Sequence, residues 1–277
     1  MTHRVLSALT VSLLGLGGCS EPGQDEQEVP VLVVHASDYS FAAPDTARAG
    51  WVWLRLVNQS ESLHHVQVYR IPAETSADQF FSDLPAAEPM PSTLEALGGP
   101  EGADDPRVEV QAAVHLSPGD YALVCRFETQ EGVLHMHEGM THHLTVVAVP
   151  GRDQVDPWMG VRDTIWLQDF SFALSDGIRA GTRDFVVVNR GPSEHHVAIG
   201  RLRPGMGLED VLASYSDPAA PEAYDVVGGT AGIGPGVQNV ARANLEPGRH
   251  VLVCFIVDPV TGMEHVQLSM VRVFDVT

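Results

Sequence analysis

Residues 119–140 read GDYALVCRFETQEGVLHMHEGM, and this stretch decides how the rest of the chain is interpreted. Up to Cys125 the residues alternate as in a β-strand, with Tyr121 and Cys125 on the same face. The loop that follows carries His135 and Met140. A thiolate, an imidazole and a thioether therefore fall within one strand and the loop after it. This is the ligand chemistry of a soft transition-metal site.

A second copy of this unit lies near the C-terminus. Residues 248–270 read GRHVLVCFIVDPVTGMEHVQLSM and place Cys254, His265 and Met270 in the equivalent positions. The offset is 129 residues for the cysteines and 130 for the histidines and the methionines. Offsets of 129 to 131 also relate residues 38–41 to 169–172, Asn58 to Asn189, 64–66 to 195–197, and 116–121 to 245–250. A period this long indicates two duplicated domains rather than a solenoid.

Each copy consists mostly of short strand patterns separated by turn signals. The predicted strands cover residues 51–57, 66–69, 121–127 and 143–149 in the first copy, and 185–188 and 271–276 in the second. Pro-Gly turns precede the cysteine strands at residues 118–119 and 247–248. This pattern predicts an all-β fold of two tandem β-sandwiches.

Each copy also contains a long insertion, at about residues 72–105 and 204–236. A short helix is predicted in each insertion, at residues 75–84 and 208–212. The insertions either cover the metal end of the domain, dock a partner, or are decoration, and the sequence does not separate these alternatives.

The N-terminus has the features of an export signal. Arg4 precedes an apolar run, residues 5–16, that is too short to span a bilayer. Residues 16–19 read LGGC, which resembles the lipobox of bacterial lipoproteins. The resemblance implies cleavage after residue 18 and lipidation of Cys19. An ordinary signal peptide with a chance cysteine is the alternative.

The predicted organisation follows from these features: a signal peptide (1–18), a lipidated tether (19–29), a first domain (30–149), a linker (150–160) and a second domain (161–277). We expect a protein of the bacterial cell envelope, anchored to a membrane by lipid on its periplasmic or extracellular face. The choice between inner and outer membrane stays open.

The chain is strongly acidic, with a formal net charge of −20 and no lysine. Such a surface disfavours nucleic acid as a partner, because nucleic-acid binding needs a basic footprint. A basic protein partner would be attracted to it by long-range electrostatics. Adaptation to a salty habitat is an equally good explanation of the charge.

A further histidine in each copy comes from a separate strand. His64 has the parity of the apolar residue Val66, and His195 occupies the equivalent place. These two histidines are therefore predicted to point inward as ligands. Their neighbours His65 and His196 have the opposite parity, so they either face solvent or close the site from outside.

Two imidazoles and a thiolate in a plane, with a weak axial thioether, form a type 1 copper site. The predicted cofactor is copper, at two sites. Their ligands are His64, Cys125, His135 and Met140 in the first copy and His195, Cys254, His265 and Met270 in the second. A disulfide between the two cysteines is the alternative, but it would require equivalent sites of two domains to meet. The first loop also contains His137, His142 and His143, which either bind a second metal or form a polar loop.

The order Asn58, His64, Pro118-Gly119, Cys125, His135, Met140, repeated in the second copy, resembles the cupredoxin family of type 1 blue-copper proteins. The resemblance covers the chain from about residue 30 onward. It implies antiparallel Greek-key sandwiches with copper near one end. The spacing from cysteine to histidine is longer than in plastocyanin and azurin, and nearer to that of copper nitrite reductases. Two-domain members often form trimers, so a homo-oligomer is an open expectation.

The resemblance leaves a carrier and an enzyme to be distinguished. Two-domain copper enzymes of the family need a second copper centre, with a histidine next to the copper cysteine. Here Val124 and Arg126 flank Cys125, and Val253 and Phe255 flank Cys254. The sequence therefore favours an electron-transfer lipoprotein, with a redox protein such as a cytochrome c as partner, over a copper oxidoreductase. The alternative is a copper-binding or metal-free structural or interaction lipoprotein without redox turnover. Whether the chain is an enzyme stays uncertain at this point.

Overall fold

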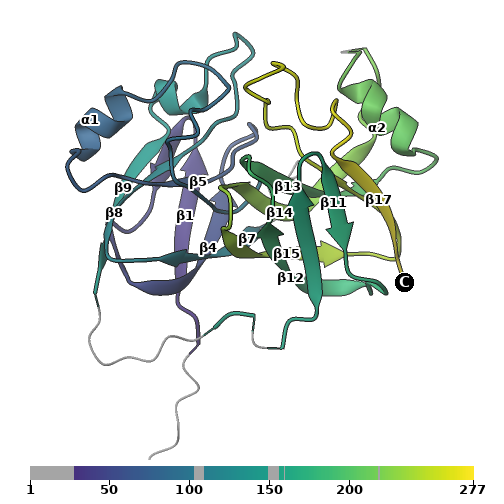
Figure 1. The fold of residues 1–277 in the computed structure, drawn as a ribbon, viewed down its shortest axis with the longest axis horizontal. Coiled ribbons are helices and arrows are strands. Elements are labelled where there is room, and N and C mark those ends of the chain that lie inside the picture. Colours follow the sequence, from purple (N-terminus) through teal and green to yellow (C-terminus); the bar gives the residue numbers. More distant parts are fainter. Residues whose placement is uncertain (1–27, 103–108, 149–155, 159, 218) are drawn as a thin grey trace, which may run out of the picture.

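A computed structural model describes residues 28–102, 109–148, 156–158, 160–217 and 219–277. The two copies of the repeat fold as two Greek-key β-sandwiches that lie side by side (Figure 1), so the predicted fold class is confirmed. The predicted signal peptide, Cys19 with most of its tether, residue 149 at the end of the first domain, and residues 150–155 and 159 of the linker lie outside the described residues. Among the helices that are described, none is long and apolar enough to cross a membrane.

The first sandwich packs a four-stranded sheet against a five-stranded one. In spatial order, the first sheet contains β2 (Ser40–Ala42), β1 (Val31–Ser37), β4 (Gly50–Asn58) and β7 (Val110–Leu116). The second contains β3 (Thr46–Arg48), β9 (Thr141–Val147), β8 (Gly119–Val124), β5 (Gln67–Arg70) and β6 (Ala96–Gly98). The pairs β1–β4 and β3–β9 are parallel, and the others are antiparallel.

The second sandwich repeats this arrangement. One sheet contains β11 (Ser171–Leu174), β10 (Asp163–Gln168), β12 (Gly181–Asn189) and β15 (Gln238–Leu245). The other contains β17 (Val271–Val276), β16 (Gly248–Val253), β13 (His195–Leu202) and β14 (Tyr224–Ile233). The equivalent order of strands explains why equivalent ligand residues reach the same end of each domain.

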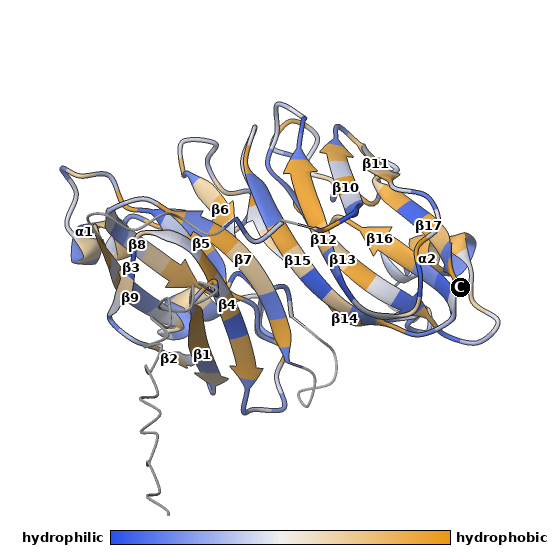
Figure 2. Ribbon diagram, turned by 90° about the horizontal axis from the view of Figure 1, so that it is seen from below, coloured by the Kyte–Doolittle hydropathy of each residue, from blue (hydrophilic) through white to orange (hydrophobic). Residues whose placement is uncertain are grey.

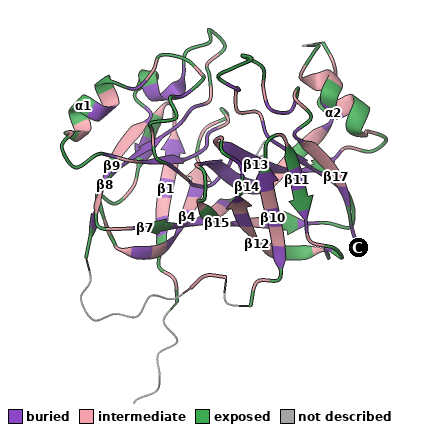
Figure 3. Ribbon diagram, viewed as in Figure 1, coloured by how far each residue is buried: buried purple, intermediate pink, exposed green. Residues whose placement is uncertain are grey.

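Strand β8 shows how the first ligand cysteine is positioned. Tyr121 and Cys125 face the core between the two sheets, as the alternation predicts. Ala122 and Val124 face a second apolar cluster, which the first insertion covers through residues such as Phe80. Both faces of the strand are therefore buried, and Figures 2 and 3 show the apolar, buried residues along the inner strands of both domains.

The two insertions carry the predicted short helices, α1 (Ala77–Ser82) and α2 (Leu208–Ser214). The Ser76 hydroxyl caps α1 by accepting a hydrogen bond from the Gln79 backbone N–H. Figure 1 shows both helices on the outer flanks of the molecule, at the end where the ligand loops lie. A 3₁₀ helix, His135–Glu138, lies within the first of these loops.

The two sandwiches are joined strand to strand. Strand β7 pairs antiparallel with β15, and the central pair is Ala112 with Ala241. These alanines are equivalent positions of the repeat, so a local two-fold axis passes between them. Next to this contact, β6 meets β14 at Leu97 and Ile233. The sheets of the first domain therefore continue into the second.

Two equivalent glycines allow a close approach to the segments that carry the histidines. Gly99 has φ +134°, and a Cβ there would lie 2.0 Å from the carbonyl oxygen of Val66. Gly229 has φ +141°, and its Cβ would lie 2.1 Å from the carbonyl oxygen of Val197. Only a residue without a side chain fits such positions.

Candidate metal centres

The first centre is formed by three segments that converge at one end of the first sandwich. His64 precedes β5, Cys125 follows β8, and His135 begins the 3₁₀ helix. The Nδ1 atoms of His64 and His135 are 3.2 Å apart. Cys125 Sγ lies 3.5 Å from His135 Nδ1 and 4.0 Å from His64 Nδ1. Three buried ligand atoms therefore surround one point.

The second centre repeats this geometry. His195 begins β13, Cys254 follows β16, and His265 lies in the loop after it. The two Nδ1 atoms are 3.1 Å apart, and Cys254 Sγ lies 3.4 Å from His265 Nδ1. The sulfur also accepts a hydrogen bond from the backbone N–H of His196 at 3.5 Å. The structure thus brings together three of the four predicted ligands in each copy.

Both groups fit a single transition-metal ion. Bonds of about 2.0 Å to nitrogen and about 2.3 Å to sulfur, arranged in a plane, would separate the ligand atoms by about 3.5 to 3.7 Å. The N–N and S–N separations of 3.1 to 4.0 Å lie around these values. Two imidazoles with a thiolate suit copper or zinc and disfavour hard ions such as magnesium.

The predicted methionine ligands lie beside the cysteines through backbone hydrogen bonds. The N–H of Cys125 donates to the carbonyl of Met140 at 3.2 Å, and the N–H of Cys254 donates to that of Met270 at 3.2 Å. Both methionines are fully buried, each in the same core as its cysteine. Their role as axial thioether ligands stays a prediction.

Burial sets the protonation of both centres. It raises the pKa of each cysteine thiol to about 12. Burial, followed by the charge of the partner ligand histidine, lowers the pKa of His64 and of His265 to about 4. At neutral pH the imidazoles are therefore neutral and ready to bind, whereas metal binding must displace the thiol proton. Both thiols are free and lie in different cores, which is at odds with the disulfide alternative.

The fold has known counterparts, although all the likenesses are weak. The structure is similar to auracyanin A from Chloroflexus aurantiacus (17% identity, TM-score 0.31), a match covering 43% of this chain and 100% of the auracyanin. It is also similar to a copper-containing nitrite reductase from Thermus scotoductus (12% identity, TM-score 0.24), a match covering 89% of this chain and 61% of the reductase.

A multicopper oxidase from Campylobacter jejuni gives a similar result (9% identity, TM-score 0.26), with 90% of this chain and 64% of the oxidase covered. No protein-family model matches the chain. No curated protein sequence matches it either. Because every one of these TM-scores lies below 0.5, function has to be argued from the site itself.

The neighbours of the ligand histidines are buried, so of the two alternatives for His65 and His196 the one in which they face solvent is wrong. They lie at the domain interface, 5% and 3% exposed, on either side of the buried carboxylate of Glu101. His65 Nδ1 is 3.6 Å from one carboxylate oxygen, and His196 Nδ1 is 4.0 Å from the other. Strand parity gave the right direction for these side chains, but the face they point to is covered by the other domain.

This interface cluster is not arranged as a third metal site. The backbone N–H of Arg126 donates to His65 Nε2 at 2.8 Å, and that of Phe255 donates to His196 Nε2 at 2.9 Å. In a neutral imidazole the remaining proton then sits on Nδ1, which faces Glu101 as a donor and offers no lone pair to a metal. Burial alone would raise the pKa of Glu101, but the two histidines and the Gly102 N–H lower it below its ordinary value.

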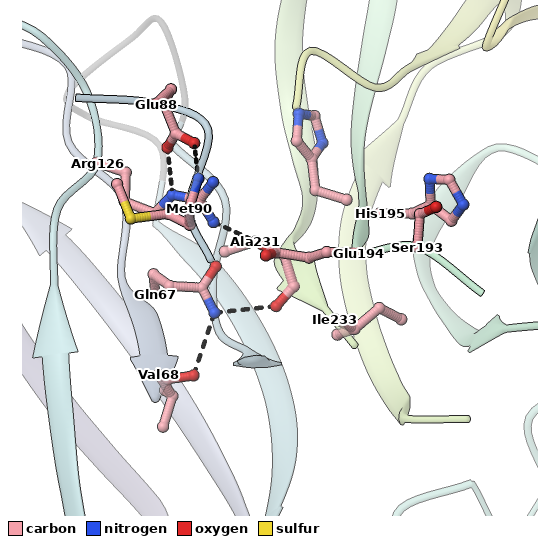
Figure 4. A network of polar contacts seen from close by, with 12 residues as sticks. Gln67, Val68, Glu88, Met90, Arg126, Ser193, Glu194, His195, Ala231 and Ile233 are labelled. Carbon is pink, nitrogen blue, oxygen red and sulfur yellow. Dashed lines mark hydrogen bonds and ion pairs between the residues drawn. The ribbon is translucent and has the colours of Figure 1, made fainter. Parts of the chain in front are cut away.

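An ion pair joins the two centres next to this cluster. Arg126, which follows the ligand Cys125, is buried and reaches Glu88 at 2.6 Å and Glu194 at 2.5 Å. Glu194 belongs to the other domain and immediately precedes His195. Figure 4 shows the side chain of Glu194 directed towards Arg126, while His195 lies on the other side of the same segment. Gln67 adds a second link by donating to the carbonyl of Gly232 at 2.9 Å.

Two further contacts hold the outer nitrogens of the ligand histidines. The Ser60 hydroxyl oxygen lies 2.8 Å from His64 Nε2. In the second centre the partner is a carboxylate, with Asp169 Oδ1 2.5 Å from His195 Nε2. Sequence reasoning used Asp169 only as a marker of the repeat. The available signal was a difference between the copies: the equivalent positions, 131 residues apart, are Ser60 in the first and Gly191 in the second.

Of the three extra histidines predicted in the first loop, His137 lies in the 3₁₀ helix and His142 and His143 lie on β9, and each has a separate partner. His137 Nε2 lies 2.6 Å from the carbonyl oxygen of Pro85, and His142 Nε2 lies 3.2 Å from that of Pro44. His143 Nε2 pairs with a carboxylate oxygen of Asp120 at 2.8 Å. Across the described part of the chain, the groups able to hold a metal are the two centres above. The polar-loop interpretation is therefore favoured.

The buried imidazoles make the metal-free protein sensitive to acid. Burial, as the main cause, lowers the pKa of His196 to about 3 and that of His64 and His265 to about 4, from 6.5. The unfolded chain then binds protons that the folded chain does not. The free energy of unfolding should fall as the pH drops from 7 to 5, by up to about 1.4 kcal/mol per pH unit for each such histidine.

Urea unfolding of metal-free protein at several pH values between 7 and 5 measures this slope. His196→Gln should reduce the slope by about one proton. His137→Gln, at an exposed histidine, is the matched control, and it should change the slope less than His196→Gln does. Equal slopes for all three proteins would contradict the assignment.

Proposed function

We propose that the chain is a copper-binding electron-transfer lipoprotein with two type 1 copper sites. The observation that carries the proposal is the recurrence of one buried group, two Nδ1 atoms and one thiolate, at equivalent places in both domains. A group kept by chance packing would not be expected to recur in register. The methionines then complete each site as weak axial ligands.

Copper in such a site supplies a one-electron redox couple. The chain contributes a binding pocket that is already assembled: His64, Cys125 and His135 in one domain, and His195, Cys254 and His265 in the other. Each ligand comes from a different strand end or loop of a packed sandwich, so the ligand positions change little when charge changes. Complete burial of both sulfurs keeps water away from the metal positions.

The remaining parts of the proposal concern the cell and the partners. Lipidation at Cys19 would place the protein at the bacterial cell envelope, on the periplasmic or extracellular side. The formal net charge of −20 favours a basic redox protein, such as a cytochrome c, as the partner. The second candidate function is a copper-binding or metal-free structural lipoprotein without redox turnover, and a copper oxidoreductase is disfavoured because no histidine is adjacent to Cys125 or Cys254.

Copper content and colour test the proposal. Protein loaded with copper should hold two copper ions per chain and show the intense visible band of a thiolate bound to copper. Cys125→Ser and Cys254→Ser form a matched pair, and each should remove one copper and about half of the band. A colourless wild-type chain that takes up no copper would disprove the proposal.

The reactions of the reduced protein separate carrier from enzyme. Oxidation by cytochrome c, with no turnover of nitrite or dioxygen, is the result expected for a carrier. Sustained turnover of nitrite or dioxygen would instead favour the oxidoreductase. Stable binding of copper that is not oxidised by cytochrome c, nitrite or dioxygen would favour the structural alternative.

A further inference from the structure

Each centre contains the same kind of turn, and the residue facing the ligand histidine differs between them: Ser60 in the first and Gly191 in the second. In each, an asparagine side-chain oxygen accepts the backbone N–H two residues further on, from Asn58 to Ser60 and from Asn189 to Gly191. The two turns occupy equivalent places in the repeat. In the first centre the serine places its hydroxyl oxygen 2.8 Å from Nε2 of the ligand His64.

The glycine of the second centre leaves this space to a carboxylate. A Cβ on Gly191 would lie 2.6 Å from Asp169 Oδ1 and 2.8 Å from His195 Nε2. Asp169 instead reaches His195 directly, at 2.5 Å, while its other oxygen accepts a hydrogen bond from the Ser193 hydroxyl at 3.0 Å. The carboxylate is therefore held in place by a second donor and aimed at the outer nitrogen of the metal ligand.

A carboxylate on the outer N–H of a ligand histidine makes the imidazole a stronger donor to its metal. A hydroxyl, which carries no charge, does so less. The stronger donor stabilises the higher oxidation state of the metal over the lower one. We therefore infer that the second domain holds its copper at a lower reduction potential than the first, with Asp169 as the positioning residue that sets the difference. The inference rests on the proposed function.

Two other differences between the copies act in the same direction. The residue before the ligand histidine is Leu63 in the first copy and Glu194 in the second. The residue after the ligand cysteine is Arg126 in the first copy and Phe255 in the second. The positions flanking the ligands thus carry a positive charge in the first copy and a negative charge in the second, whereas Asp38 adds a negative charge near His64 of the first centre. Because Glu88 also pairs with Arg126 and offsets its charge, the main contribution remains that of Asp169.

The difference gives electron flow within the chain a direction. With copper bound at both groups, one electron would pass from Cu(I) held by His195, Cys254 and His265 to Cu(II) held by His64, Cys125 and His135, and no proton or covalent bond would be transferred. The Arg126–Glu194 pair connects the two ligand segments across the interface. The second domain would accordingly receive electrons from a donor, and the first would deliver them to an acceptor.

Spectroelectrochemical titration of the copper-loaded chain tests this order. Cys125→Ser retains only the second centre and Cys254→Ser only the first, so each potential is measured by itself. At a common applied potential, the ratio of reduced to oxidised copper should be at least about tenfold lower at the second centre, which corresponds to about 59 mV for one electron. Asp169→Asn keeps an oxygen acceptor but removes the charge, and it should move the second centre towards the first.

Asp38, the equivalent residue of the first copy, provides the matched control, and Asp38→Asn should shift the first potential much less. Ser193→Ala, which loosens Asp169, should raise the second potential by a smaller step than Asp169→Asn. The affinity for Co²⁺ gives a readout without redox chemistry: Asp169→Asn should lower it about 10- to 100-fold at the second centre only.

Equal or reversed potentials, or a second potential unchanged by Asp169→Asn, would overturn the inference and leave the proposed function intact. Failure of both single-site variants to bind copper would overturn the inference together with the proposed function.

Discussion

Replacing Arg126 by methionine is expected to lower the free energy of unfolding of the metal-free protein by about 3 to 5 kcal/mol. The guanidinium is buried and pairs with Glu88 and Glu194, one from each domain. Methionine fills a similar volume, so packing is largely kept. The substitution removes the positive charge that the two carboxylates share, so the repulsion between them is no longer offset by Arg126.

Urea unfolding measures the loss, and Arg242→Met is the matched control. Arg242 pairs with Asp184 of its own domain and crosses the interface to lie over the ring of Trp53. Its side chain is 34% exposed, so water can replace the lost contacts and the cost should be about 1 to 2 kcal/mol. Adding Glu88→Gln and Glu194→Gln to Arg126→Met should recover much of the loss. Equal losses for both arginine variants would contradict the role given to the buried pair.

The second large effect is expected from Gly99→Ala, at about 3 to 5 kcal/mol. The φ of +134° is strained for any residue with a side chain, and the added Cβ would lie 2.0 Å from the carbonyl oxygen of Val66. That carbonyl belongs to the segment carrying His64. The variant should therefore lose copper from the first centre while the second retains it. Combining Gly99→Ala with Cys254→Ser or with Cys125→Ser isolates each centre, and copper analysis and the visible band then show which one is lost.

Gly132→Ala separates the effect of the clash from that of the backbone angle. Gly132 also has a positive φ, +77°, but nothing lies within 4 Å of the position of its Cβ. Its replacement should cost only about 1 to 2 kcal/mol and leave both copper sites filled. If Gly99→Ala were as mild as this control, the close approach of Gly99 to Val66 would not be important for stability.

The fold was predictable because both signals that define it, strand alternation and the internal repeat, are visible in the sequence. Alternation along residues 121–125 gave the face of β8, and the offset near 130 gave the second domain. The short helices predicted at residues 75–84 and 208–212 correspond to α1 and α2. The three atoms of each centre came from two residue types, histidine and cysteine, that repeat in register, and strand parity selected His64 over His65.

What could not be predicted depends on contacts between the domains. Nothing local to His65 shows that its outer face is covered, because the cover comes from the second domain. Glu101 lies in the first insertion, and its role as the buried carboxylate between His65 and His196 follows only from the contact between the domains. Likewise, the carboxylate on His195 could be inferred only by comparing the two copies and asking what replaces Ser60.

The local two-fold axis at Ala112 and Ala241 gives the molecule the interface of a homodimer within a single chain. In a dimer of identical chains the axis would copy every substitution into both halves. Glu101 could not then stand alone between two histidines, because a second glutamate would appear opposite it; here the equivalent position is Ala231. Covalent fusion lifts that constraint, so one half can become a donor and the other an acceptor without any loss of the shared architecture.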